Sequence, residues 1–302
     1  MAKIAVVGSL NMDLVAVAPR IPVPGETIIG SDFLTAPGGK GANQAYAAAK
    51  LRGDTAMLGR VGTDDFGRAM RQNLASVGCE VTGVRDVAGP SGVALIFVAE
   101  SGANSIVVAP GANHKLTPAD IAADASLFNG CSVALLQLEN TLETVTAAAQ
   151  YAKQRGARVI LDPAPAPSGP LPEELLKAVD ILTPNETEAA MLAGLPPRPL
   201  TSDEAAHIAR VLQAKGTPTV IVKLGAQGCL LTDGNEQRLI PAPKVKAVDT
   251  TAAGDVFNGA LAVALSEGKD LVTACGFAVK AGSVSVTRMG AQSSAPSREE
   301  IN

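Results

Sequence analysis

The segment from Asp249 to Asp255 combines small residues with a carboxylate at a point where an anion could bind. Gly254 can adopt positive φ, and the small side chains let the backbone approach a ligand closely. A helix-like apolar run, 256–265, follows, and a helix start offers unpaired N–H groups and the positive end of its dipole. At this position Asp255 would be suited to act as a general base, which takes the proton of a hydroxyl about to be phosphorylated. The run before the segment, 245–248, predicts a strand. The alternative is therefore an ordinary strand–turn–helix junction, with Asp255 as a first-turn carboxylate favoured by the dipole.

A glycine-rich segment, 38–43, supplies a second candidate site. Three glycines in four positions predict unusual dihedrals or a close ligand approach, and Lys40 and Asn43 add a cation and an amide. The segment is not a P-loop, because Leu34 stands where a P-loop needs its first glycine and Gly41 follows the lysine. The alternative is a common glycine-rich helix start.

Polar side chains also follow two strand-like runs. Asn11 and Asp13 come after the first run, 3–8, and Glu139 ends another, 135–138. Ligands on parallel α/β sheets lie beyond the carboxyl ends of the strands. A carboxylate there can accept two sugar hydroxyls, while an amide can both donate and accept. Taken alone, each residue is also explained as a turn residue or a helix cap.

Two further segments suit a nucleotide. Asn185 and Glu188 begin a helix and share one of its faces, which predicts an N-cap and also a pair that could hold water around Mg²⁺. The run 219–224 ends in a tight turn that we interpret as a wall for the nucleotide, formed by Lys223, Gly225 and Gly228.

Strand-like and helical runs alternate along most of the chain. Strands are expected over 3–8, 133–138, 158–161, 180–182 and 219–224, and helices over 41–51, 142–154, 186–192 and 202–215. This order predicts an α/β fold with a doubly wound, mostly parallel sheet sandwiched by helices. Residues 13–35 and 91–108 break the rhythm and predict a small β-sheet lid, with 1–12, 36–90 and 109–302 as the main domain. The lid could cover a cleft, pair with a second subunit, or do both.

Composition narrows the function classes. The 302 residues carry a net charge of −4 with scattered Lys and Arg, so no nucleic-acid partner is expected. No apolar stretch reaches the roughly 18 residues of a membrane span, and the N-terminus lacks the features of a signal peptide, so a cytoplasmic protein is expected. The 4 cysteines form no Cys-x-x-Cys pair and the 2 histidines stand alone, which argues against a zinc site or a histidine relay.

The motifs occur in the order of a known family. Segment 38–43 continues through 47–49 and 59–64, segment 249–255 continues through 257–259, and Asn185 to Glu188 lies between them. Over essentially its whole length the chain resembles the ribokinase-like (PfkB-type) sugar kinases. Segments 8–13, 39–44, 136–139, 162–166 and 287–292 are most similar to the members that act on D-ribose.

The resemblance implies a reaction in which Asp255 deprotonates the 5-hydroxyl of D-ribose, which attacks the γ-phosphate of ATP. Backbone N–H groups of Ala252, Ala253, Gly254 and Asp255 would form an anion hole. It also implies four sets of binding residues: for the sugar Asn11, Asp13, Gly39, Lys40, Asn43, Glu139 and Asp255; for the nucleotide Asn185, Lys223, Gly225, Gly228 and Gly254; for Mg²⁺, through water, Asn185 and Glu188; and for a monovalent cation such as K⁺ Asp249, Thr251, Ser285, Arg288, Gly290 and Ser294.

Two further expectations come from the resemblance. A homodimer that pairs through the lid sheets is expected. Family members often have glycine at position 252, and the Ala252 of this chain would be tolerated if its φ is negative.

Other functions are weighed against this one. The nearest is a kinase of the same family for 2-deoxyribose, another sugar or a nucleoside. An amide at Asn11 aimed at the 2- or 3-hydroxyl favours ribose, and a nucleoside would need more aromatic lid residues than Phe33 and Phe97. A non-catalytic sugar-binding regulator would be expected to lack Asp255. A dehydrogenase is disfavoured because no Gly-x-Gly-x-x-Gly follows the first strand.

Overall fold

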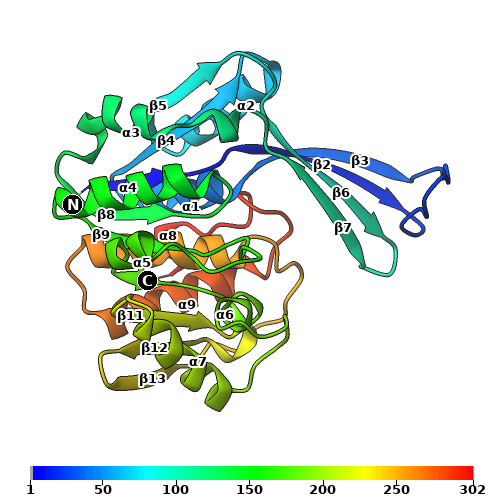
Figure 1. Cartoon of the computed structure of the whole chain (residues 1–302). Coiled ribbons are helices and arrows are strands. Elements are labelled where there is room, and N and C mark those ends of the chain that lie inside the picture. The colour runs from blue at the N-terminus through cyan, green and yellow to red at the C-terminus, as the bar shows by residue number, and fades with distance from the viewer. Residues whose placement is uncertain (1–2, 302) are drawn as a thin grey trace.

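The computed structural model describes residues 3–301 and contains a nine-stranded sheet and a four-stranded sheet (Figure 1). The large sheet has the order β13-β12-β11-β10-β9-β8-β1-β4-β5. Neighbouring strands from β11 to β5 are parallel, while β12 and β13 add an antiparallel edge. The strands are β1 (Lys3–Val7), β4 (Thr55–Gly62), β5 (Glu80–Val87), β8 (Cys131–Leu136), β9 (Arg158–Leu161), β10 (Ile181–Leu182), β11 (Thr219–Lys223), β12 (Cys229–Asp233) and β13 (Glu236–Ile240).

Helices cover both faces of this sheet, because successive strand residues point to opposite faces and each face is apolar. In β1, Ile4 and Val6 pack in one core with α1, α2, α8 and α9, while Ala5 and Val7 pack in the other with α3 to α7. The predicted doubly wound α/β fold is confirmed. The helices are α1 (Lys40–Lys50), α2 (Asp65–Ser76), α3 (Pro118–Ala123), α4 (Leu142–Gln154), α5 (Glu173–Ala178), α6 (Glu186–Leu192), α7 (Ser202–Ala214), α8 (Ala253–Ser266) and α9 (Leu271–Ser285).

The second sheet projects from one end of the main body (Figure 1). It has the order β3-β2-β6-β7, formed by β2 (Asn11–Ala18), β3 (Asp32–Gly38), β6 (Gly92–Ala99) and β7 (Asn104–Ala109). Its strands therefore begin slightly before residue 13 and end slightly after residue 35. Large apolar side chains remain exposed on it: Phe33, Leu34, Leu95, Phe97, Ile106, Val107 and Val108.

One expected strand is absent from the described residues. The run 245–248 forms no strand, and the expectation was wrong there. The N–H groups of Val248 and Asp249 both donate to the carbonyl of Val286, and the side chains of Val245 and Val248 are exposed. The apolar pattern is that of a strand, but the Val286 carbonyl at the end of α9 takes up the last N–H groups of the run, and no strand pairs with it among the described residues.

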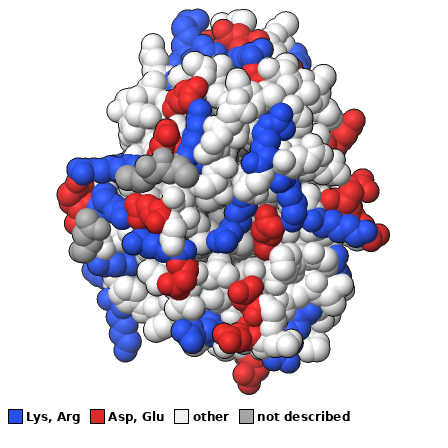
Figure 2. Space-filling model, turned by 90° about the vertical axis from the view of Figure 1, so that its left-hand side faces the viewer, with Lys and Arg blue, Asp and Glu red and all other residues white. Residues whose placement is uncertain are grey.

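The structure also shows how charged side chains are distributed on one face and whether a helix could cross a membrane. On the face shown in Figure 2, acidic and basic side chains are interspersed. Among residues 3–301, no helix combines the length and the apolar character that crossing a bilayer requires.

Gly41 lets α1 pack directly on the turn after β1. A Cβ at this position would lie 2.6 Å from the Ser9 nitrogen and 2.7 Å from the Gly8 carbonyl carbon, both backbone atoms. We therefore expect Gly41→Ala to lower the free energy of unfolding by about 3 kcal/mol, measured by urea denaturation. Gly276→Ala is the matched control, since a Cβ in this helix would meet nothing within 4 Å; it should be neutral or stabilising. Equal stability of the two variants would contradict the prediction.

Candidate active site

Asp255 lies buried in the first turn of α8, where it meets the glycine-rich segment. The Asn43 side chain donates from Nδ2 to Asp255 Oδ2 at 3.0 Å, and Gln44 donates from Nε2 to Asp255 Oδ1 at 3.1 Å. Burial raises the pKa of Asp255 to about 6, the charge of Lys40 opposes this shift, and Asp162 adds to it. The carboxylate is thus oriented by two donors and poised to accept a proton near neutral pH.

Free backbone N–H groups lie at the start of the same helix. Among the described residues, the N–H groups of Ala252, Gly254 and Asp255 have no hydrogen-bond partner, whereas Ala253 N–H donates to the Thr250 carbonyl at 3.3 Å. Three donors at the start of a 14-residue helix form a site for an anion. Of the four N–H groups expected to form an anion hole, the structure leaves three available.

The backbone of Ala252 does not meet the condition under which an alanine would be tolerated here. Its φ is 56° and its ψ is 13°, in the left-handed region instead of at negative φ. The residue lies at the N-cap of α8, where the chain reverses direction to begin the helix. An alanine held in this region costs roughly 1–2 kcal/mol, which explains why glycine suits this position.

The sugar-side residues surround the same carboxylate. Glu139 Oε2 accepts from the Lys40 backbone N–H at 3.0 Å and lies 3.4 Å from Asn11 Nδ2. Burial raises the pKa of Asp13 to about 7, with the charges of Glu139 and Asp255 adding to the shift. Gly39 has a φ of 89°, and a Cβ there would lie 2.6 Å from the Asn11 nitrogen, so glycine is required.

Lys40 is a cation among these acids. Burial alone would lower its pKa, but Asp255, Asp162, Glu139 and Glu188 raise it above the ordinary value. The ammonium is therefore charged throughout the physiological range, where it can balance an incoming phosphate.

Lys223 reaches the anion site from β11. Its Nζ forms an ion pair with Asp162 Oδ1 at 2.9 Å and would lie 3.3 Å from a Cβ on Gly254. The predicted nucleotide turn follows it, with Gly225 at a φ of 52° and Gly228 at 100°. A Cβ on Gly228 would lie 2.0 Å from the Ile240 carbonyl oxygen. Packing therefore requires glycine at this position whether or not a nucleotide binds there.

Asn185 and Glu188 cap the start of α6 reciprocally. Asn185 N–H donates to Glu188 Oε2, and Glu188 N–H donates to Asn185 Oδ1, both at 2.8 Å. Burial raises the pKa of Glu188, and the charge of Lys223 opposes this shift. One carboxylate oxygen of Glu188 is left outside the capping pair, which fits contact with Mg²⁺ through water better than a direct ligand set. Among residues 3–301, no three His, Cys, Asp or Glu side chains cluster as metal ligands.

Of the residues expected around a monovalent cation, hydrogen bonds to Asp249 join Thr251 and Gly290. Asp249 Oδ1 accepts from the Thr251 N–H at 2.9 Å, and Asp249 Oδ2 accepts from the Gly290 N–H at 2.8 Å. The other side chains turn to local partners: Ser285 to Gly282, Ser294 to Ala291 and Arg288 to Glu300. Asp249 thus links the loop before α8 to the loop around Gly290.

Four buried polar residues near the base were absent from the predicted site. Gln44 Nε2 donates to Asp162 Oδ2 at 3.0 Å as well as to Asp255, and Gln137 Nε2 donates to Gln44 Oε1 at 2.7 Å. Gln292 Nε2 donates to Asn43 Oδ1 at 3.1 Å. Asp162 and Gln137 follow the carboxyl ends of β9 and β8, so the rule that selected Glu139 could have found them.

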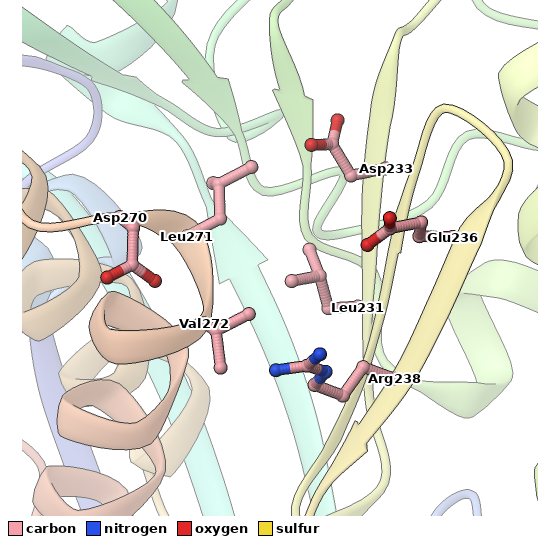
Figure 3. Close-up of a pocket in the computed structure, with 7 residues that line it drawn as sticks. All are labelled: Leu231, Asp233, Glu236, Arg238, Asp270, Leu271 and Val272. Carbon is pink, nitrogen blue, oxygen red and sulfur yellow. The ribbon is translucent and has the colours of Figure 1, made fainter.

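A surface pocket of about 340 Å³ lies elsewhere, between the β12–β13 hairpin and the start of α9 (Figure 3). It contains none of the residues described above. Its lining residues are Leu231, Asp233, Glu236, Arg238, Asp270, Leu271 and Val272.

Comparison with known proteins identifies the family. The model of the pfkB family carbohydrate kinases matches residues 1–298. The chain belongs to this family. It is 42% identical over 300 residues to a ribokinase from Haemophilus influenzae, covering 98% of this chain and 96% of the relative. It is 41% identical over 300 residues to a deoxyribokinase from Salmonella typhimurium, covering 99% and 97%. The structure of Arabidopsis thaliana ribokinase complexed with ribose and ATP superposes with a TM-score of 0.91 at 36% identity, covering 99% and 97%.

As a pfkB-family kinase, the protein should lose activity in acid before it unfolds. A base must be deprotonated, so kcat/KM should fall as the pH drops through the pKa of about 6 at Asp255. The pKa of Asp255 is higher in the folded protein than the unfolded value of 3.8, so the folded state binds this proton more tightly. The resulting contribution to stability is fully present below pH 3.8 and is lost as the pH rises through about 6. A pH profile of kcat/KM, with circular dichroism at each pH, checks this. Full activity at pH 5 would contradict it.

Proposed function

We propose that this protein transfers the γ-phosphoryl group of ATP to the 5-hydroxyl of D-ribose, giving D-ribose 5-phosphate and ADP. The observation that carries the proposal is Asp255, buried with a pKa raised to about 6 beside three free N–H groups of the loop that begins α8. The Haemophilus relative is a ribokinase, and the Arabidopsis neighbour is a ribokinase complexed with ribose and ATP. Both relatives support D-ribose and ATP as the substrates of this protein.

In the proposed reaction Asp255 takes the proton of the 5-hydroxyl as its oxygen attacks the γ-phosphorus and the bond to ADP breaks. The N–H groups of Ala252, Gly254 and Asp255 and the ammonium of Lys40 stabilise the charge that develops on the phosphoryl oxygens. Asn11, Asp13 and Glu139 hold the sugar, with Gly39 and Asn43 completing its site.

The other bound groups follow from the same arrangement. We propose that Lys223, Gly225 and Gly228 line the nucleotide. Asn185 and Glu188 would hold Mg²⁺ through water, and this ion neutralises phosphate charge when bound. K⁺ beside Asp249 and Thr251 would stiffen the loop that carries the anion hole, with Ser285, Arg288, Gly290 and Ser294 closing the loop around it.

A second candidate substrate is 2-deoxyribose, favoured by the deoxyribokinase relative at 41% identity. The experiment is coupled ATP turnover with D-ribose, 2-deoxyribose, fructose 6-phosphate and adenosine, each with and without K⁺. Turnover highest with ribose and raised by K⁺ supports the proposal. Turnover only with another acceptor would keep the kinase and replace the substrate.

We also propose that the lid sheet pairs two copies of the chain. Cross-strand register places Phe33, Phe97, Leu95 and Val107 on one face and Asp13 on the other, because paired residues share a face and neighbours alternate. The Asp13 face, on which Leu34, Ile106 and Val108 are also exposed, looks toward the sugar site. This leaves the first face, with its own exposed apolar side chains, for a partner.

A charge on this face should separate the subunits. We expect Phe97→Asp to convert a dimer to a monomer, because it would bury an unpaired carboxylate in an apolar interface. Size-exclusion chromatography with light scattering measures the mass. Ile106→Asp is the matched control, an exposed position on the opposite face. A monomeric unaltered protein, or a dimeric Phe97→Asp variant, would refute pairing through this face.

A further inference from the structure

Asn113 lies behind the sugar-side residues, where the lid joins the main domain. It belongs to the short 3₁₀ helix Gly111–Lys115 that follows β7, and the residue is buried, with 1% exposed. No motif in the sequence singled it out. Its contacts nevertheless determine how Asn11 faces the sugar.

The backbone of Leu10 fixes the orientation of the Asn113 amide. Leu10 N–H donates to Asn113 Oδ1 at 2.9 Å, and Asn113 Nδ2 donates to the Leu10 carbonyl at 3.1 Å. A backbone N–H can only donate and a carbonyl can only accept, so turning the amide over would lose both bonds. The NH₂ group of Asn113 is therefore held toward Asn11, to whose Oδ1 it donates at 2.7 Å.

This bond decides which atom of Asn11 faces the sugar site. Because Asn113 occupies its Oδ1, Asn11 turns Nδ2 toward Glu139 Oε2, at 3.4 Å. Ser9 Oγ and the Lys40 N–H also donate to Glu139 Oε2, so Oε1 is the carboxylate oxygen left to accept from a ligand. Asn11 thus presents a donor beside this acceptor. Such a pair matches a sugar hydroxyl, which can accept from the amide and donate to the carboxylate.

Neighbouring residues leave this arrangement little freedom. A Cβ on Gly92, the first residue of β6, would lie 2.2 Å from both Asn11 Oδ1 and Asn113 Nδ2. Asn140 Nδ2 donates to the Asn113 carbonyl at 2.8 Å. The bond between the two asparagines is therefore enclosed by the base of the lid on one side and by the loop that carries Glu139 on the other.

We propose that Asn113 is a positioning residue that sets the preference of the site for ribose over 2-deoxyribose by holding the Asn11 amide with its NH₂ group toward the sugar. The inference rests on the proposed function and names a determinant of its substrate choice. Asn113 acts through Asn11 and does not take part in the phosphoryl transfer.

Asn113→Asp tests this directly. An ionised carboxylate only accepts, so Asn11 must turn its NH₂ group to it and present its carbonyl to the sugar. We expect the ratio of kcat/KM for ribose to that for 2-deoxyribose to fall at least about tenfold, chiefly through a higher KM for ribose. Thr144→Val is the matched control: it removes a buried hydroxyl that donates to Leu116, just after the same 3₁₀ helix, and touches neither asparagine. Its ratio should equal that of the unaltered chain.

Two further variants keep the test decisive if Asn113→Asp does not fold. Gly92→Ala should lower the ratio by forcing the two asparagines apart. In an Asn11→Ala background, the Asn113 substitution should leave the ratio unchanged, because the residue through which it acts is gone. If the unaltered chain prefers ribose but the ratio is unchanged in the folded Asn113→Asp or Gly92→Ala variant, the inference is overturned and the proposed substrate stands. An unaltered chain that does not use ribose overturns the proposed substrate and the inference with it.

Discussion

Asp255→Asn should lower kcat for sugar phosphorylation by about 1,000-fold. The amide cannot take the hydroxyl proton, while its size and its position in α8 are kept. Single-turnover and steady-state assays with ribose and ATP measure the loss. Asp270→Asn is the matched control, since Asp270 caps α9 through a bond to the Thr273 N–H and lies outside the site. It should keep full activity.

The same variant should stay folded. Burial makes an ionised Asp255 unfavourable for folding at pH 8, so removing the charge offsets the donor–donor contact that an asparagine NH₂ group makes with Asn43 or Gln44. Thermal unfolding should therefore change by a few degrees at most. A folded Asp255→Asn variant that retains a tenth of the activity would exclude this carboxylate as the base.

Gln44→Met should lower kcat/KM by about 100-fold and move its acid limb to higher pH. The fully buried amide uses its NH₂ group on two carboxylates, Asp255 and Asp162, and its oxygen is held by Gln137. A methionine of similar size loses both donor contacts. The bond from Gln44 lowers the pKa of Asp255, so its loss leaves more of the base protonated at neutral pH.

A loss of stability alone would reduce the amount of active enzyme without moving the pH profile. The profile of kcat/KM therefore separates orientation of the base from a merely structural role. Gln150→Met is the matched control, because it makes the same glutamine-to-methionine change at an exposed position of α4. An acid limb that stays where it is in the unaltered protein would show that Gln44 does not act on Asp255.

The motif residues could be recognised in the sequence because their types are unusual for their surroundings. A carboxylate at a glycine-containing helix start identified Asp255, and a polar residue after an apolar strand identified Glu139. Gln44, Gln292 and Asn113 carry no such signal, since buried amides inside helices and loops also serve ordinary structural roles. Their contacts with Asp255, Asn43 and Asn11 appear only when distant segments are packed together.

Local rules also failed where the answer depended on a neighbour. The run 245–248 has the apolar pattern of a strand, but its end is held by the Val286 carbonyl and it pairs with no strand of the described residues. An alanine at position 252 would suit negative φ, yet the residue adopts 56° at the turn into α8. At Ala252 the rest of the fold outweighs a preference of about 1–2 kcal/mol.

The alternation of helices and strands, the apolar faces of the strands and the choice of Asp255 as the candidate base follow from the amino-acid sequence, because periodicity and turn chemistry act over a few residues. The folded chain was needed to show which amides hold that base, which face of the lid remains uncovered and how far burial shifts the pKa of Asp13 and Asp255. Asn43 and Asp255 are 212 positions apart in the chain, and only the packing of α1 against α8 brings their side chains to 3.0 Å.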